Sequence, residues 1–281
     1  MGMTVARKII EAGHSLTAYD TSSEALDRIR QIGATAVLSP KEVAEKADVI
    51  IMFLPGPEQV CACVIEDDGL LAGARPGTVI ADMSTVDPDT SRRMAQLADK
   101  REVGYLDAPV LGRPASVGNW ALAVGGTKES LERCEPIFML FAAKVFLIGE
   151  SGSGNKVKLL NQLMFSAINA MTAEMMAVAE KTGISPKLLY ETITESQAGT
   201  VSNLFKELGA RIANDDYESP TFSVDLLCKD VRLAISMAKE AKAPPLLATT
   251  TQIINETAQA QGLGQRDTSF MLTVFKKLWQ E

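Results

Sequence analysis

Three polar residues of the chain, Lys158, Asn161 and Gln162, have a spacing that a helix would bring onto one face. They stand at positions i, i+3 and i+4, and residues three and four apart are neighbours on a helix surface. The preceding segment Gly152-Ser-Gly154 has the backbone freedom that the start of a helix needs. A lysine in an apolar helix costs desolvation energy unless it has a role or a partner. The spacing therefore predicts a site that gives or takes a proton, the alternative being a lysine that reaches the surface.

Two shorter motifs precede this one, Asp82-Met-Ser-Thr85 and Asp107-Ala-Pro-Val-Leu-Gly112. Ser84 and Thr85 follow directly on a strand predicted over residues 78–83. Open α/β sheets bind their ligands beyond the carboxyl ends of such strands, so we expect Thr85 to lie near a ligand. Thr85 is also suited to cap the helix predicted from Pro88, and both roles are compatible.

The start of the chain resembles the second half of a Gly-x-Gly-x-x-Gly dinucleotide-binding unit. Gly2 precedes a helix predicted to end at Gly13, and Asp20 ends the next strand, 18 residues after Gly2. We interpret Gly2 as the third glycine of the unit and Asp20 as the acid that binds the ribose. A strand and turn of about a dozen residues would then be missing, and we expect weak nucleotide binding. The alternative is that Gly2 is a flexible terminal residue and Asp20 a helix cap.

The remaining pattern predicts an α/β protein with two domains. Strands are expected at residues 15–20, 34–38, 48–54, 78–83, 104–108, 120–125 and 144–148, and helices at residues 22–31, 40–46 and 88–100. Apolar strands that alternate with helices are typical of a parallel sheet covered on both faces. Beyond Gly154 the periodicity is helical, with turns at residues 183–186, 219–220 and 243–245. We predict a doubly wound, Rossmann-type domain over residues 1–151, without its first strand, and an all-helical substrate and oligomerisation domain over residues 152–281.

The composition narrows the possible functions. The chain has 281 residues, 46% of them hydrophobic and 22% charged, as expected for a globular protein with two cores. A net charge of −7 without a basic cluster argues against nucleic acid as a partner, and no apolar run reaches the length of a membrane span. One histidine and four cysteines without metal or redox spacing predict no metal site. We expect a cytoplasmic protein with reduced thiols.

In order, spacing and content, the three motifs resemble those of the 3-hydroxyisobutyrate dehydrogenase (β-hydroxyacid dehydrogenase) family. The resemblance covers nearly the whole chain from Gly2 onward and implies reversible hydride transfer between NAD(P) and a small β-hydroxy acid or its semialdehyde. It assigns Lys158 as the catalytic general acid/base and Asn161 and Gln162 as the amide pair that positions the substrate. In the oxidation Lys158 would take the hydroxyl proton, and in the reduction it would donate that proton.

The resemblance also places a substrate-binding segment at Leu111, Gly112 and Arg113. The family usually has Asp-Ala-Pro-Val-Ser-Gly-Gly here, and its serine and glycines bind the substrate carboxylate. In this chain Leu111 and Arg113 replace the serine and the second glycine, so we expect a carboxylate-bearing substrate other than 3-hydroxyisobutyrate. Arg113 would supply a charged, bidentate donor in place of the lost ones, the alternative being an exposed loop arginine.

The cofactor contacts implied by the resemblance are Gly2, Met3, Asp20, Leu54, Pro55, Val60, Thr85 and Lys229. Thr85 would lie near the nicotinamide ribose, and Lys229 would reach the cofactor from the segment 222–230. Asp20 without a neighbouring arginine favours NAD over NADP, because a carboxylate repels a 2′-phosphate. Alternatively, Leu54 and Pro55 merely end a strand, and Lys229 forms a surface charge pair with Asp230.

Two other classes of function stay open, an imine or aldehyde reductase of the same architecture and a catalytically silent, oligomeric binding protein. The intact polar face around Lys158 favours hydroxy-acid chemistry over the reduction of imines or aldehydes. The presence of Lys158 argues against a silent binding protein, whereas the incomplete Gly-x-Gly-x-x-Gly unit argues for one. We expect the protein to be a homodimer or homotetramer.

Overall fold

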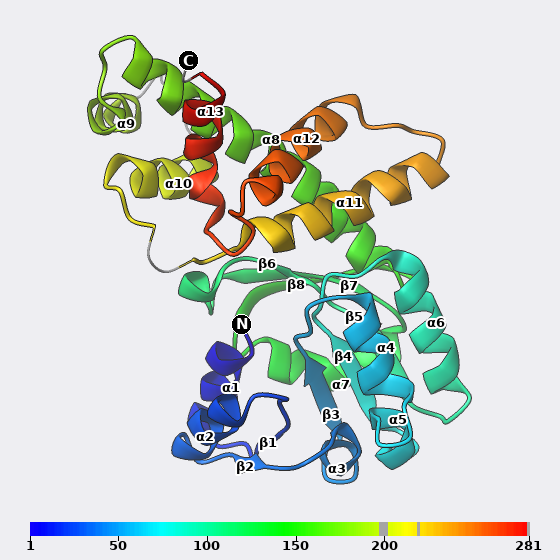
Figure 1. Cartoon of the computed structure of the whole chain (residues 1–281). Helices are drawn as coiled ribbons and strands as arrows, with labels where there is room; N and C mark the ends of the chain where they lie inside the picture. Colours follow the sequence, from blue (N-terminus) through cyan, green and yellow to red (C-terminus); the bar gives the residue numbers. More distant parts are fainter. Residues whose placement is uncertain (197–201, 218–219, 280–281) are drawn as a thin grey trace. The chain divides into compact units, whose positions relative to one another are not determined.

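The computed structural model describes residues 1–196, 202–217 and 220–279, which form two compact units, Met1–Lys158 and Leu159–Glu281 (Figure 1). Ser219, in one of the predicted turns, lies outside the described residues. In the described part of the chain, no helix has both the length and the apolar character of a membrane span.

The first unit alternates strands and helices, as the sequence predicts. Its strands are β1 (Thr17–Ala18), β2 (Thr35–Ala36), β3 (Val49–Met52), β4 (Val79–Asp82), β5 (Gly104–Asp107), β6 (Val110–Leu111), β7 (Trp120–Gly125) and β8 (Ala142–Gly149). Its helices are α1 (Gly2–Glu11), α2 (Ser23–Gln31), α3 (Pro40–Ala44), α4 (Pro57–Ile65), α5 (Leu70–Gly73), α6 (Pro88–Asp99), the short 3₁₀ helix η1 (Pro114–Ser116) and α7 (Lys128–Phe138).

The strands form two separate sheets. One has the order β3-β4-β5-β7-β6, with β8 paired to β7, and the other contains β1 and β2 alone. The pairs β1–β2, β3–β4 and β4–β5 are parallel, which confirms the predicted parallel sheet in this part. At the far side β7 runs antiparallel to β5 and to β6, so a sheet predicted as parallel is in fact mixed. The two-residue strand β6 was not predicted at all.

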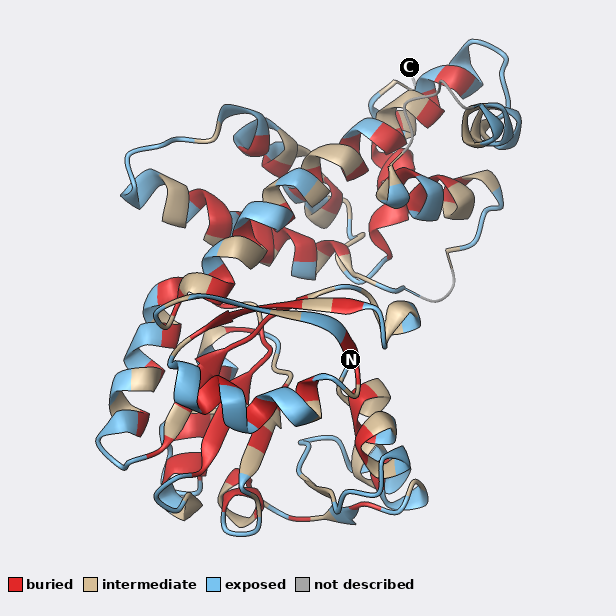
Figure 2. Ribbon diagram, turned by 180° about the vertical axis from the view of Figure 1, so that it is seen from behind, coloured by how far each residue is buried: buried red, intermediate tan, exposed pale blue. Residues whose placement is uncertain are grey.

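Alternating side chains of the larger sheet enter two hydrophobic cores, as expected for strands covered on both faces. Val79 and Ala81 of β4 belong to the core that includes residues of α1 and α7, whereas Ile80 belongs to the core beneath α4 and α6. The central strands are accordingly among the most buried elements of this unit (Figure 2).

The helices begin where the sequence supplies caps. Ser22, Ser39, Asp87 and Thr127 each accept a backbone N–H in the first turn of their helix. Two predicted alternatives are therefore wrong. Asp87 rather than Thr85 caps α6, and Ser22 rather than Asp20 caps α2.

The named elements in the described residues of the second unit are all helices, which confirms the predicted helical C-terminal part. Among these residues, one isolated antiparallel β-bridge joins Ser223 and Asp267. Helix α8 (Ser153–Lys181) begins in the first unit and continues into the second. It is followed by α9 (Pro186–Glu195), α10 (Asn203–Ala213), α11 (Val224–Glu240), α12 (Leu246–Ala260), the 3₁₀ helix η2 (Thr268–Met271) and α13 (Leu272–Leu278). The main core of this unit contains Met176, Phe205, Met271 and Phe275.

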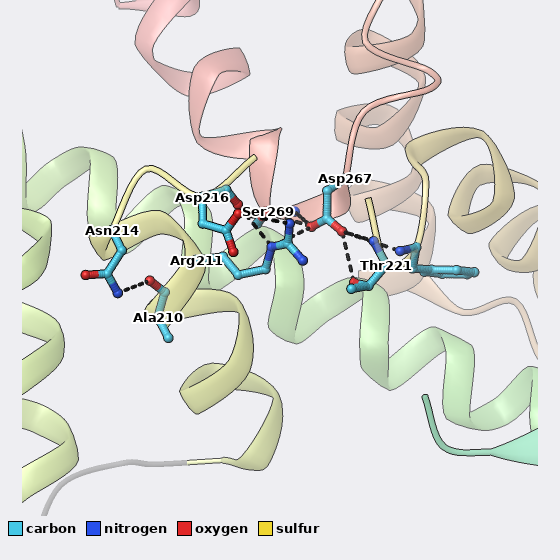
Figure 3. Close-up of polar contacts among 8 residues, drawn as sticks. Ala210, Arg211, Asn214, Asp216, Thr221, Asp267 and Ser269 are labelled. Atoms are coloured by element: carbon cyan, nitrogen blue, oxygen red, sulfur yellow. Dashed lines mark hydrogen bonds and ion pairs between the residues drawn. The ribbon is translucent and has the colours of Figure 1, made fainter. Parts of the chain in front are cut away.

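A buried carboxylate joins the loop before α11 to the segment before η2 (Figure 3). Asp267 is fully buried and accepts hydrogen bonds from the backbone and hydroxyl groups of Ser269 and Thr221. Arg211 Nε of α10 lies 3.8 Å from the same carboxylate. This network ties three segments of the second unit together.

Candidate active site

The carboxylate of Asp107 organises the start of α8. Asp107 ends β5 and has no exposed surface. Its Oδ1 accepts the backbone N–H of Gly152 over 2.6 Å, and its Oδ2 accepts that of Asn155 over 2.8 Å. The N–H groups at the start of a helix lack partners within the helix and carry partial positive charge, so a carboxylate stabilises them.

Burial and hydrogen bonding act on Asp107 in opposite directions. Removal from water raises the pKa of this carboxyl, and the backbone N–H groups of Gly152 and Asn155 lower it. Burial outweighs the hydrogen bonds, so the pKa of Asp107 rises to about 6.

Asn155 links the same helix start to a second loop. Its side-chain Oδ1 accepts the backbone N–H of Val86 over 3.1 Å, and its Nδ2 donates to Ser91 Oγ over 3.2 Å. Val86 follows Thr85 directly in the loop after β4, so the first turn of α8 is bonded to the ends of two neighbouring strands, β4 and β5.

Lys158 lies near the start of α8 and is half-buried. Its Nζ donates to the backbone carbonyl of Val110 in β6 over 3.0 Å. The ammonium is therefore held by a neutral acceptor in the segment that follows Asp107. The alternative in which Lys158 simply extends into solvent does not describe this geometry.

The two amides of the predicted site differ in their surroundings. Asn161 is exposed, and its Nδ2 lies 3.5 Å from Oε1 of Gln162. Gln162 is buried and donates through Nε2 to Asp230 Oδ2 of α11 over 2.6 Å. Lys229 Nζ lies 2.8 Å from the other oxygen of Asp230, whose side chain is only 4% exposed. The expected surface charge pair is thus anchored on a buried carboxylate.

The predicted substrate-binding segment forms the end of β6 and the turn after it. Leu111 and Arg113 are half-buried and Gly112 is exposed. The carbonyl of Arg113 accepts hydrogen bonds from Trp120 Nε1 over 2.7 Å and from Ser116 Oγ over 3.0 Å. A Cβ at position 112 would collide with the indole of Trp120, which explains the glycine. The backbone of this turn is fixed, and Arg113 is not a fully exposed loop arginine.

Residues expected near the cofactor lie at the carboxyl ends of β3 and β4. Ser84 Oγ accepts the backbone N–H of Leu54 over 2.9 Å, so the two strand ends are bonded to each other. Leu54 and Thr85 are half-buried, and Pro55 is exposed. Val60 requires a correction: it is 0% exposed within the core beneath α4 and α6, so its side chain has no surface to offer a cofactor.

The two remaining regions lie at the start of the chain. Gly2 and Met3 form the first turn of α1, whose N-cap residue Met1 makes no side-chain capping bond. Gly2 is therefore helical rather than a flexible end. Asp20 is exposed just after β1 and accepts the backbone N–H of Ser22 over 2.8 Å.

Asp107 and Asn155 were not identified from the sequence as structural partners, and Asp230 was identified only as the partner of Lys229, not of Gln162. All three lie inside segments that were recognised from the sequence, but the residues to which they are hydrogen-bonded are 45 to 69 positions away in the sequence. The only sequence signal was a charged or amide side chain in an apolar setting.

Comparison with known proteins shows the family of the chain. Residues 1–149 match the family model of the NAD binding domain of 6-phosphogluconate dehydrogenase, and residues 152–275 match that of NADP-dependent 3-hydroxyisobutyrate dehydrogenase. The chain is 31% identical to NAD-dependent L-serine dehydrogenase of Pseudomonas aeruginosa, over 98% of this chain and 94% of the relative. It is also 31% identical to 3-hydroxyisobutyrate dehydrogenase of the same organism, over 92% of this chain and 90% of the relative.

The solved structures agree at the level of the fold. The crystal structure of 3-hydroxyisobutyrate dehydrogenase from Salmonella typhimurium matches with a TM-score of 0.90 and 27% identity, over 98% of this chain and 96% of that one. The two family models that match the first and second parts of the chain define an NAD(P)-dependent oxidoreductase. The chain belongs to the 3-hydroxyisobutyrate dehydrogenase family.

Proposed function

We propose that this protein interconverts a small 3-hydroxy acid and its semialdehyde, with Lys158 as the general acid/base. The observation that carries the proposal is the position of Lys158 on α8, where its Nζ is hydrogen-bonded to the carbonyl of Val110. This hydrogen bond holds Nζ at β6, so a substrate hydroxyl bound beside it would exchange a proton with Nζ. Asn161 and Gln162 on the next turn would orient the substrate through their amides.

The residues present fit a nicotinamide dinucleotide. The first turn of α1 has no side-chain cap, and its backbone N–H groups suit a pyrophosphate. The exposed carboxylate of Asp20 suits a ribose hydroxyl, and Leu54, Pro55 and Thr85 lie at strand ends, where open sheets bind ligands. Val60, which is buried, would support the loop after β3 from beneath. The cofactor, when bound, supplies the hydride acceptor or donor.

We favour NAD over NADP because Asp20 is the charged residue at the end of β1. A carboxylate there accepts hydrogen bonds from a ribose and repels a 2′-phosphate. Its hydrogen bond from Ser22 N fixes one carboxylate oxygen and leaves the other for a ligand.

The substrate carboxylate would bind Gly112 and Arg113. The half-buried Arg113 lies three residues after Val110, whose carbonyl accepts the hydrogen bond from Lys158 Nζ. The proposed carboxylate-binding residue and the proposed acid/base therefore meet the same short segment of chain. Two relatives are named for L-serine and 3-hydroxyisobutyrate, and both compounds are 3-hydroxy acids. Leu111 offers no hydroxyl, so Gly112 and Arg113 would supply the hydrogen-bond donors to the carboxylate.

A direct experiment tests the proposal in two steps. Fluorescence titration with NADH and NADPH shows whether a cofactor binds and which is preferred. A set of 3-hydroxy acids, including L-serine and 3-hydroxyisobutyrate, is then assayed with the preferred cofactor, alongside cyclic imines and simple aldehydes with the reduced form. Turnover of imines but not of hydroxy acids would identify the alternative reductase, and binding without any turnover would identify a silent binding protein.

We further propose that the protein is a homodimer or homotetramer. The exposed side of α8 carries Leu160, Met164, Met171 and Val178, which are 58%, 63%, 61% and 46% exposed. Met164, Met171 and Val178 are spaced by seven residues, the repeat with which helices pack against each other. Light scattering coupled to size-exclusion chromatography measures the mass directly, and a monomer at micromolar concentration would disprove this assignment.

A cytoplasmic location is proposed on the state of the cysteines. Cys61, Cys63, Cys134 and Cys228 are all free thiols in the structure, as is usual in a reducing compartment. Fractionation of cells that express the protein, followed by immunoblotting, tests this location.

A further inference from the structure

The segment Asp107–Val110 is bonded to α8 at both of its ends. At one end, the Asp107 carboxylate accepts the N–H groups of Gly152 and Asn155. At the other end, the carbonyl of Val110 accepts the hydrogen bond from Lys158 Nζ. The segment and the first turns of α8 therefore form a closed unit, in which a shift of the helix start also shifts Nζ.

We propose that Asp107 is a positioning residue that sets the location of the Lys158 ammonium by fixing the first turn of α8. The inference rests on the proposed function, because it concerns the lysine assigned there to proton transfer. Asp107 itself touches neither substrate nor cofactor in this scheme. It acts through the backbone of Gly152 and Asn155, three or more residues before Lys158.

A carboxylate is the side chain that can accept both N–H groups, those of Gly152 and Asn155. Two converging N–H donors need two acceptor oxygens, and an ionised aspartate offers acceptors only. An asparagine would turn an NH₂ group toward one of the two donors and leave that donor buried without a partner. The space is also restricted, because a Cβ at Gly125 or Gly154 would press against the Asp107 carboxylate.

The other hydrogen bonds of the first turn of α8 also hold this turn in a single position. Asn155 is fully buried and is bonded through its side chain to Val86 and to Ser91. With the two bonds from Asp107, the first turn of α8 is tied to the ends of β4 and β5 and to α6. A lysine on such a helix is pre-organised, and pre-organised groups lose less energy to rearrangement during a reaction.

Several charged or titratable groups surround Asp107. Asp82 of β4 and Tyr105 of β5 interact with it electrostatically, and Arg92 of α6 lies close to Gly152. Burial is the main cause that raises the pKa of Asp107 to about 6, and the negative charge of Asp82 adds a smaller contribution in the same direction. Protonation would replace an acceptor oxygen by a hydroxyl donor, so the helix start should loosen below this pH.

The first test compares Asp107→Asn with Tyr105→Phe. Tyr105 is buried in the same strand and donates to Asp82 rather than to α8, so its variant controls for the loss of one buried hydrogen bond. We expect kcat of Asp107→Asn to fall about 100-fold, the effect of a misplacement of roughly 1 Å, with KM for the cofactor unchanged. Tyr105→Phe should lower the melting temperature and leave kcat at the wild-type value. A folded Asp107→Asn enzyme with wild-type kcat would overturn the proposal.

The second test needs no turnover. Lysines are labelled by reductive ¹³C-methylation, and the Lys158 signal is assigned by its loss in Lys158→Met. We expect the chemical shift of Lys158 to change in Asp107→Asn but not in Tyr105→Phe. In the wild-type protein, the plot of this chemical shift against pH should show a second inflection near pH 6, where Asp107 titrates. If Asp107→Asn does not fold, the wild-type titration decides, and a Lys158 signal without that inflection would overturn the proposal. Absence of any dehydrogenase activity in the wild-type protein would instead refute the proposed function and leave this test in place.

Discussion

Gln162 and Asp230 join two helices of the second unit through a short hydrogen bond. Nε2 of Gln162 on α8 donates to Oδ2 of Asp230 on α11 over 2.6 Å, and both residues are 3% exposed. The ion pair of Lys229 with the other oxygen of Asp230 completes a chain from an amide through a carboxylate to an ammonium. A buried carboxylate with partners on both oxygens keeps α8 and α11 in one register.

Replacement of Gln162 by leucine should therefore destabilise the protein. The variant keeps the volume of the side chain but removes the donor to a buried carboxylate, which typically costs about 1.5–3 kcal/mol. Urea denaturation followed by circular dichroism measures the change in the free energy of unfolding. The control is Asn161→Ala at the exposed neighbouring position, which we expect to stay within about 0.5 kcal/mol of the wild type. Equal effects of the two variants would show that the bond contributes no net stability.

Lys158→Met should abolish most turnover without unfolding the protein. Methionine retains the apolar stem and removes the group that exchanges the proton, a change that typically costs about 10²- to 10⁴-fold in rate. Steady-state kinetics with the substrate found by the screen measure kcat, and a cofactor titration shows whether binding is unchanged. Lys156→Met, at an exposed position of the same helix, is the matched control. Near-full kcat in Lys158→Met would exclude this lysine from the mechanism.

Arg113→Ala should weaken the binding of acidic substrates. Loss of a charged hydrogen bond to the substrate carboxylate should raise KM by the equivalent of about 1.5–3 kcal/mol. The corresponding neutral substrate, such as an ester of the hydroxy acid, should show a smaller change. Arg75→Ala removes an exposed arginine paired with Asp48 and serves as the control. If KM is the same in wild type and Arg113→Ala, the guanidinium does not bind the carboxylate.

The sequence predicted most of the elements but not how distant residues meet. The strands over residues 48–54, 78–83 and 120–125 and the helix from Pro88 were found because apolar runs and caps are local signals. Such signals do not determine the direction in which strands pair, so the antiparallel β7 and the two-residue β6 were missed.

The same limit applies to the candidate site. The spacing of Lys158, Asn161 and Gln162 was read from one helix, and the structure has all three on α8. The partner of Gln162 is 68 residues away, and those of Asp107 are 45 and 48 residues away. Only the folded chain brings these groups together, which is why the roles of Asp107 and Asp230 had no local signature.

Asp267 should make the stability of the protein depend on acid pH (Figure 3). Burial raises the pKa of this carboxyl, but its hydrogen bonds from Ser269 and Thr221 outweigh burial and hold the pKa below its ordinary value of 3.8. A carboxyl whose pKa is lower in the folded state than in the unfolded state stabilises the fold at any pH above its unfolded-state pKa. This stabilisation is lost as the pH falls through its folded-state pKa.

We therefore expect Asp267→Asn to lose about 1.5–3 kcal/mol at neutral pH, with a difference from the wild type that shrinks below pH 3.8. Denaturant titrations of both proteins between neutral and acid pH measure this difference. A constant difference across the range would show that the Asp267 carboxylate is not stabilised by its ionisation.

The strands of the first unit are divided between two separate sheets. Within residues 1–158, β3 pairs only with β4, and β1 pairs only with β2. Helix α1 nevertheless packs against both sheets, with Val5 and Ile9 against β3 and β4 and with Ala6 against β1 and β2. One helix thus covers both sheets, and each sheet ends in a parallel strand with an open edge. An open edge exposes backbone N–H and C=O groups that another strand can bind.

An N-terminal extension with a strand of about five or six residues and a Gly-x-Gly turn should pair with these edges. The added turn would bring more backbone N–H groups to the start of α1, so NAD should bind more tightly and the melting temperature should rise. Calorimetric titration and thermal unfolding measure both effects, and an extension of equal length made of glycine and serine is the control. If the control extension has the same effects, or the 281-residue chain already binds NAD as tightly as the extended one, the strand is not required. Gly2, Met3 and Asp20 would then be sufficient to hold the dinucleotide.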